Sequence, residues 1–173
     1  KSLKNLKQNY LEGLLLHSPK NLSKDQKSLV QEWLLEIKQE KKVNKIGLSI
    51  YEELDIKDYE LKIMDIIQVP FSIYDQRLLN SGFLKLLNSK GIEIYARSIF
   101  LQGLILNHSA NWPYWALNKD RKLHDDFLRL IKEFDLSPLE TSLAFVQKNP
   151  FINKIIVGFT TSLEFLEILD AMY

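Results

Sequence analysis

The sequence predicts an α/β fold with a parallel sheet, and it favours an incomplete TIM-type (β/α)8 barrel of about five βα units. Apolar runs of strand length alternate five times with helical patterns, the order that crossover connections between parallel strands produce. Most residues within each run are apolar, as in strands that are covered on both faces. The alternative, a doubly wound open sheet, lacks the G-x-G-x-x-G motif after its first strand.

The expected strands share this apolar character and cover residues 10–19, 43–50, 63–72, 91–100 and 153–159. Each one closes with polar or glycine residues, which are His17 with Ser18, Ser49, Gln68, Arg97 with Ser98, and Gly158. TIM barrels carry their chemistry at the carboxyl ends of the strands. We therefore expect these residues to face a common rim.

Helical patterns fill the segments between the strands. Ser23 and Ser137 are expected N-caps, and Pro138 suits the first helical position. Gly91 is the expected C-terminal signal of a helix that covers residues 76–91. The other helical segments are expected at residues 24–42, 51–62, 120–135, 137–150 and 161–173, and the amino terminus resembles part of a helix.

Composition narrows the class of protein. The chain has 173 residues, of which 46% are hydrophobic and 26% charged, and we expect a single domain over residues 1–173. A net charge of +1 gives no reason to expect a nucleic-acid partner. The chain has no cysteine, which excludes zinc-thiolate sites and suits a reducing cytoplasm. We expect no metal cofactor and no membrane span.

Five stretches resemble the aldo-keto reductase family, in order, over nearly the whole chain. "SLKNLKQNYLEGLLLHSP" resembles a helix and the fourth barrel strand, which carries the catalytic histidine of that family. "VNKIGLSIY" and "MDIIQVPFSIYD" resemble the fifth and sixth strands. "GIEIYARSIFLQGLIL" resembles the seventh strand with its loop, and "FINKIIVGFTTSLEFLEIL" resembles the eighth strand and the helix that holds the cofactor's phosphate.

The resemblance implies an oxidoreductase that reduces a small aldehyde or ketone with NADPH, or with NADH. The family's catalytic aspartate, tyrosine and lysine lie on strands one to three, which this chain does not resemble. A complete barrel also takes about 250 residues. We therefore expect a truncated reductase that lacks the first three strands and is inactive alone. The alternative is a non-catalytic barrel remnant that binds a nucleotide or a protein.

By resemblance, His17 is the catalytic histidine that orients the substrate carbonyl. Ser49 and Gln68 are expected to bind the nicotinamide carboxamide, although Ile50 stands where the family usually has asparagine. Arg97 replaces a stacking tyrosine; its guanidinium can stack on the nicotinamide, pair with the pyrophosphate, or form a salt bridge.

The remaining cofactor residues implied by the resemblance follow the last two strands. Contacts with the cofactor, mainly through its phosphates, are expected from Ser98, Gln102, Gly103, Gly158, Thr160 and Thr161. Thr160 or Thr161 is alternatively a simple N-cap. Glu167 is expected near the adenine, whereas Ile168 replaces the usual asparagine. No basic residue falls where a 2′-phosphate is often held, so the choice between NADPH and NADH stays open.

Other features carry weaker expectations. The aromatic loop at residues 107–115 is a candidate substrate wall, subunit contact or roof of the barrel edge. His108 and His124 have no evident partner in the sequence, and we expect both to be surface or helix residues. Open barrel edges also predict that the isolated chain self-associates.

Overall fold

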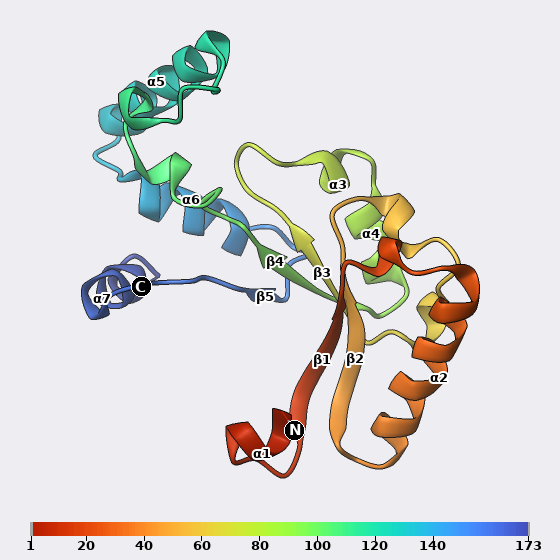
Figure 1. Cartoon of the computed structure of the whole chain (residues 1–173). Coiled ribbons are helices and arrows are strands. Elements are labelled where there is room, and N and C mark those ends of the chain that lie inside the picture. Colours follow the sequence, from red (N-terminus) through yellow and green to blue (C-terminus); the bar gives the residue numbers. More distant parts are fainter. Residues whose placement is uncertain (1, 173) are drawn as a thin grey trace. The chain divides into compact units, whose positions relative to one another are not determined.

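The computed structural model describes residues 2–172 and contains a five-stranded sheet in the order β1-β2-β3-β4-β5 (Figure 1). Strands β1, β2 and β3 pair in parallel. The strand bounds are β1 Leu11–His17, β2 Val43–Ser49, β3 Ile66–Pro70, β4 Glu93–Arg97 and β5 Lys154–Ile155. Each strand falls within the expected apolar run, which confirms an α/β fold with a parallel sheet.

The fifth strand is much shorter than residues 153–159, so the expected length was wrong. Only Lys154–Ile155 forms β5. The backbone N–H of Asn153 donates to the Ile94 carbonyl at 2.9 Å, and the side-chain Oδ1 of Asn153 accepts from the Ile94 N–H at 2.7 Å. The Asn153 side chain therefore supplies an acceptor to Ile94 just before β5 begins, while residues 156–159 lie outside the strand.

Seven α-helices are described: α1 Ser2–Leu6, α2 Lys24–Gln39, α3 Arg77–Asn80, α4 Phe83–Ser89, α5 Asn118–Glu133, α6 Pro138–Gln147 and α7 Ser162–Asp170. The single helix expected at residues 76–91 is in fact two, α3 and α4. Gly82 lies between them at a φ of 82°, a left-handed conformation that ends helices. Residues 51–62 form 3₁₀ turns at Glu53–Ile56 and Leu61–Ile63.

The expected N-caps are confirmed. Ser23 accepts a hydrogen bond from the Gln26 N–H at 3.3 Å, and the Gln26 side chain accepts from the Ser23 N–H at 2.9 Å. Ser137 and Glu140 form the same reciprocal box at the start of α6, with Pro138 at its first position. Each box satisfies two backbone donors that a helix start would otherwise leave unpaired.

The chain divides into two compact units. Unit 1 holds the residues up to Pro70 together with Arg77–Ala96 and Phe151–Lys154. Unit 2 holds Phe71–Gln76, Arg97–Pro150 and the residues from Ile155 onward. The expectation of one domain over residues 1–173 stays a prediction.

The core of unit 1 lies between helix α2 and strands β1 and β2, which run beside one another in Figure 1. Leu34 of α2 packs with Val43 and Ile46 of β2, and Leu14 of β1 joins the cluster. Ile66 and Ile67 of β3 are adjacent in sequence and both buried. Both faces of β3 are therefore covered, which explains its continuous apolar sequence.

Candidate functional site

One group of candidate residues lies at the carboxyl ends of β1, β2 and β3, within unit 1. The strand register pairs His17 with Ser49, and Ser49 with Gln68. Residues paired in this way across neighbouring strands present their side chains on the same face of the sheet. The Ser49 hydroxyl donates to Gln68 Oε1 at 2.7 Å. The structure therefore brings these three expected residues into one row.

The hydrogen bond between Ser49 and Gln68 determines which polar atoms the row presents. Because Gln68 Oε1 accepts the Ser49 proton, the amide nitrogen of Gln68 remains as a donor. The Ser49 oxygen can still accept a hydrogen bond through its lone pairs. Ser49 is only 4% exposed, so its hydroxyl is held in place by the surrounding sheet. Such a donor and acceptor together can bind a carboxamide.

His17 is exposed at the last position of β1. Its Nδ1 lies 2.9 Å from the hydroxyl of Ser18. When that hydroxyl donates to Nδ1, the imidazole proton resides on Nε2, which can then donate to a ligand oxygen.

Ile50, which stands next to Ser49 where the family usually has asparagine, belongs to the hydrophobic core. Its side chain is completely buried, and its backbone N–H donates to the Gln68 carbonyl at 2.9 Å. The residue therefore supports the position of Gln68 through its backbone, and its side chain contributes packing instead of a polar contact.

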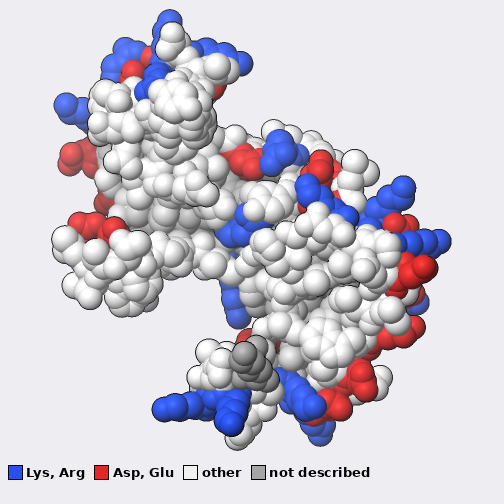
Figure 2. Space-filling view, in the orientation of Figure 1, with Lys and Arg blue, Asp and Glu red and all other residues white. Residues whose placement is uncertain are grey.

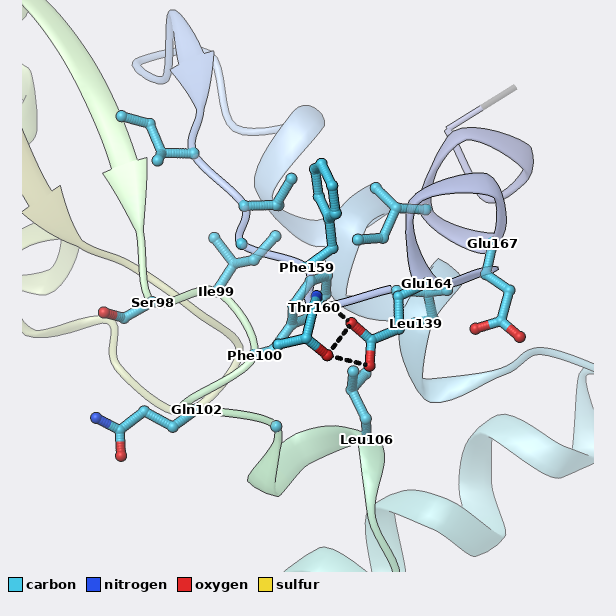
Figure 3. A pocket seen from close by; sticks show the side chains of 15 residues that line it. Ser98, Ile99, Phe100, Gln102, Leu106, Leu139, Phe159, Thr160, Glu164 and Glu167 are labelled. Carbon is cyan, nitrogen blue, oxygen red and sulfur yellow. Dashed lines mark hydrogen bonds between the residues drawn. The ribbon is translucent and has the colours of Figure 1, made fainter. Parts of the chain in front are cut away.

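The second group of candidate residues surrounds a cavity of about 440 Å³ within unit 2 (Figure 3). Six of the expected cofactor residues line it, and these are Ser98, Gln102, Gly103, Gly158, Thr160 and Glu167. The rest of the lining is mainly apolar and includes Phe100, Leu106, Phe159 and Ile168. Mainly apolar walls with a few converging polar groups are typical of small-molecule sites.

Arg97 and Thr161 flank this cavity in sequence without lining it. Arg97 donates from its guanidinium to the Ser98 hydroxyl at 3.2 Å. Thr161 is the N-cap of α7, because its hydroxyl accepts from the Glu164 N–H at 3.1 Å. The structure therefore favours the capping role that the sequence left open for Thr161.

Glu164 lines the cavity, and sequence reasoning did not single it out. Its carboxylate accepts from the Thr160 N–H at 2.6 Å and from the Thr160 hydroxyl at 3.0 Å (Figure 3). These bonds, with the backbone N–H first, lower the pKa of Glu164, so the carboxylate stays ionised at neutral pH. The signal was the Thr161-x-x-Glu164 spacing, a pattern of helix starts.

The loop after β4 carries unusual backbone geometry. Ser98, Leu101 and Gln102 have positive φ values of 57°, 47° and 57°, and Gly103 follows at 86°. A non-glycine residue in this region costs about 1–2 kcal/mol. Backbone bonds from Leu101 N–H to the Ser98 carbonyl and from Gly103 N–H to the Phe100 carbonyl stabilise the turn. Strain of this kind clusters at ligand-binding positions.

His124 lies on helix α5, one of the two expected locations, and is completely buried instead of at the surface. Its Nδ1 is 2.8 Å from the Tyr74 hydroxyl, and its Nε2 is 2.8 Å from the Asn107 carbonyl oxygen. Its ring also stacks on Trp112, with centroids 4.7 Å apart. His124 therefore anchors part of the aromatic loop.

The last two residues of that loop are open to solvent. Tyr114 is 96% exposed, and Trp115 is exposed as well. His108 is exposed, as expected, and its Nδ1 accepts from the Ala110 N–H at 3.3 Å. The loop is thus fixed to unit 2 at Trp112 and projects its last aromatic rings outward.

Two further properties concern the described part of the chain. Within residues 2–172, no group of three histidine, aspartate or glutamate residues is placed to hold a metal ion. No helix in the same range has both the length and the apolar character needed to cross a membrane.

Comparison with known proteins gives one family and a set of similar folds. The family model described as "Aldo/keto reductase family" matches residues 1–173. No curated protein matches the chain. The holo form of an aldo-keto reductase from Bacillus halodurans aligns with a TM-score of 0.74 at 22% identity, over 99% of this chain and 58% of that one.

Other solved structures give the same result. The apo form of the Bacillus halodurans protein has a TM-score of 0.73 at 22% identity, with 99% of this chain and 59% of that chain covered. An aldo/keto reductase from Klebsiella pneumoniae, in complex with NADP and acetate, has a TM-score of 0.71 at 15% identity, with coverages of 99% and 56%. The chain thus has the fold of part of a TIM barrel and spans less than three fifths of these neighbours.

Proposed function

Because the chain belongs to the aldo/keto reductase family, we propose that it supplies the cofactor-binding part and the catalytic histidine of an NAD(P)H-dependent reductase. The substrate class is a small aldehyde or ketone. The observation that carries the proposal is the row formed by His17, Ser49 and Gln68 at the carboxyl ends of three parallel strands. This is the edge at which barrel enzymes perform their chemistry.

Within this row, Ser49 and Gln68 bind the carboxamide of the nicotinamide. The amide nitrogen of Gln68 donates to the carboxamide oxygen, and the Ser49 oxygen accepts from the carboxamide nitrogen. The bond between the two side chains fixes their orientation before any ligand arrives. When bound, the nicotinamide supplies the hydride that reduces the carbonyl carbon.

His17 acts on the substrate. With its proton on Nε2, the imidazole donates a hydrogen bond to the carbonyl oxygen of the aldehyde or ketone. This bond orients the carbonyl and stabilises the negative charge that develops on oxygen as the hydride arrives. The position of His17 at the end of a strand limits its movement more than a loop would.

The cavity of unit 2 fits the adenosine portion of the cofactor. Its volume of about 440 Å³ lies within the range of small-molecule sites. A Cβ on Gly158 would meet no atom within 4 Å, so a phosphate has room to approach the backbone there. Apolar residues such as Phe100 and Phe159 can pack against the base, and Glu167 can accept from its amino group.

The remaining polar residues of unit 2 have roles toward the phosphates in this proposal. Ser98, Gln102 and Gly103 belong to the strained loop and line the cavity. Arg97 adjoins them and supplies positive charge for the pyrophosphate. We also propose a cytoplasmic location, which the absence of cysteine suits.

A titration tests the proposal. Quenching of intrinsic tryptophan fluorescence is followed while NADH or NADPH is added to the intact chain, and saturable binding of at least one of them is expected. Reduction of a test aldehyde by the same sample is then measured. We expect binding without turnover, because the family's proton-donating tyrosine belongs to strands that this chain does not resemble. Failure of both dinucleotides to bind would refute the proposal.

A further inference from the structure

The cavity of unit 2 has an acidic polar lining. Of the described residues that surround it, only Glu164 and Glu167 carry a charge. The sequence from Ile155 to Met172 contains no lysine, arginine or histidine at all. In Figure 2 the α7 region at the left of the view is accordingly white and red, with no blue.

Glu164 already fills the anion position at the start of α7. A helix start offers backbone N–H donors and a partial positive charge, which favour an anion. Here the donors of Thr160, both N–H and hydroxyl, are directed to the Glu164 carboxylate at 2.6–3.1 Å. The lowered pKa of Glu164 keeps that carboxylate charged. A second anion that approached Thr160 would therefore meet a negative charge where it needs donors, whereas the backbone at Gly158, where the cofactor's phosphate is proposed to approach, is not engaged by this carboxylate.

This arrangement differs from an ordinary capping box. In a capping box, the glutamate side chain accepts from the backbone N–H of the N-cap residue itself. The N-cap of α7 is Thr161, yet the Glu164 carboxylate reaches one residue further, to Thr160. Thr160 lines the cavity, whereas Thr161 does not. The carboxylate is thus placed at the wall of the cavity.

We propose that Glu164 makes the cavity select a dinucleotide whose adenosine ribose carries a free 2′-hydroxyl, so that the chain binds NADH in preference to NADPH. The inference rests on the proposed function and specifies its cofactor. A carboxylate accepts hydrogen bonds from ribose hydroxyls, as acidic residues do in other NAD sites. A 2′-phosphate offers the same carboxylate only repulsion, and no basic residue of the described lining offsets it.

The test compares the dissociation constants of NADH and NADPH for the intact chain and for two variants, Glu164→Gln and Glu164→Arg. The unmodified chain is expected to bind NADH at least about tenfold more tightly. Glu164→Gln should narrow this ratio, and Glu164→Arg should reverse it. Asp170→Asn, on the same helix but outside the lining, is the matched control and should leave the ratio unchanged.

A second pair of probes confines the measurement to the cavity of unit 2. The chain should bind 5′-AMP more tightly than adenosine 2′,5′-bisphosphate, and Glu164→Arg should reverse that order. Circular dichroism of each variant verifies that α7 remains helical. Equal or tighter binding of NADPH by the unmodified chain, or a ratio unaffected by both substitutions, would overturn the inference alone. Binding of neither dinucleotide would overturn the proposed function, and this inference with it.

Discussion

The Ser49 hydroxyl donates to Gln68 Oε1 across 2.7 Å, which joins two strand ends that are separated by 19 positions in the sequence. The pair occupies the same row of the sheet as His17. Because the acceptor of the Gln68 amide is already engaged, its nitrogen is left as the donor. The carboxyl edge of the sheet therefore presents one donor, the Gln68 amide nitrogen, and one acceptor, the Ser49 oxygen, whose orientation is fixed by their mutual hydrogen bond.

This relationship predicts the effect of removing the amide. Gln68→Ala should weaken dinucleotide binding by about tenfold, because one or two hydrogen bonds to the carboxamide are lost. Ser49→Ala should have a smaller effect, about threefold, since Gln68 remains but is less well oriented. Fluorescence titration measures both. Gln147→Ala, at an exposed position of α6, is the control; if Gln68→Ala binds as tightly as this control, Gln68 has no role in binding.

Substitution of two glycines by alanine should affect the stability of the fold to very different extents. A Cβ on Gly47 of β2 would lie 1.9 Å from the Ile66 carbonyl oxygen, so the backbones of β2 and β3 would have to separate. Gly47→Ala should lower the free energy of unfolding by about 1–3 kcal/mol or more. A Cβ on Gly158 would meet no atom within 4 Å, so Gly158→Ala should change the free energy of unfolding by less than about 0.5 kcal/mol. Urea denaturation measures both, and similar values would contradict the strand packing.

The sequence predicted the elements whose signals are local. Ser23 and Ser137 carry complete cap patterns, and both caps form as expected. Buried strands such as β3 can be recognised in the sequence as continuous apolar runs, because both of their faces are covered. The length of β5 was misjudged because residues 156–159 are apolar enough for a strand but form none, and an apolar run alone does not show which residues pair.

Interactions between distant positions were beyond sequence reasoning. His124 and Tyr74 are 50 positions apart, and nothing near either residue indicates the other. At the candidate site, the strand-end residues could be named because parallel strands end at one edge. The role of Glu164 was missed because its spacing from Thr161 predicts a cap, whereas its carboxylate binds Thr160.

Tyr74 predicts a dependence of stability on alkaline pH. Burial raises its pKa from 10.0 to about 12. Between these values the unfolded chain has lost the Tyr74 proton while the folded chain keeps it, so the free energy of unfolding falls as pH rises. Tyr74→Phe should remove this contribution, which gives a shallower decline from pH 10 to 12 in urea denaturation.

Tyr114→Phe provides the control for the alkaline experiment. Tyr114 is almost fully exposed in the same unit, and its substitution should leave the pH profile unchanged. Identical profiles for Tyr74→Phe and the unmodified chain would show that the Tyr74 hydroxyl is not buried against His124.

The edge of the sheet predicts self-association. Strand β1, Leu11–His17, stands at one end of the strand order and, among residues 2–172, pairs only with β2. An edge of this length presents unpaired backbone groups to a second chain. Sizing chromatography should show elution ahead of a 20.3 kDa monomer, in a fraction that grows with protein concentration. A compact monomer at every concentration would count against this expectation.

The most direct test of the proposed cofactor role is residue-resolved NMR of the intact chain during titration with NADH. We expect the amide signals of Ser49 and Gln68, and those from Gly158 to Thr161, to shift together and to saturate at the same NADH concentration. Shifts confined to other parts of the chain, such as the surface around Tyr51 and Arg77, or no saturable shifts at all, would contradict it.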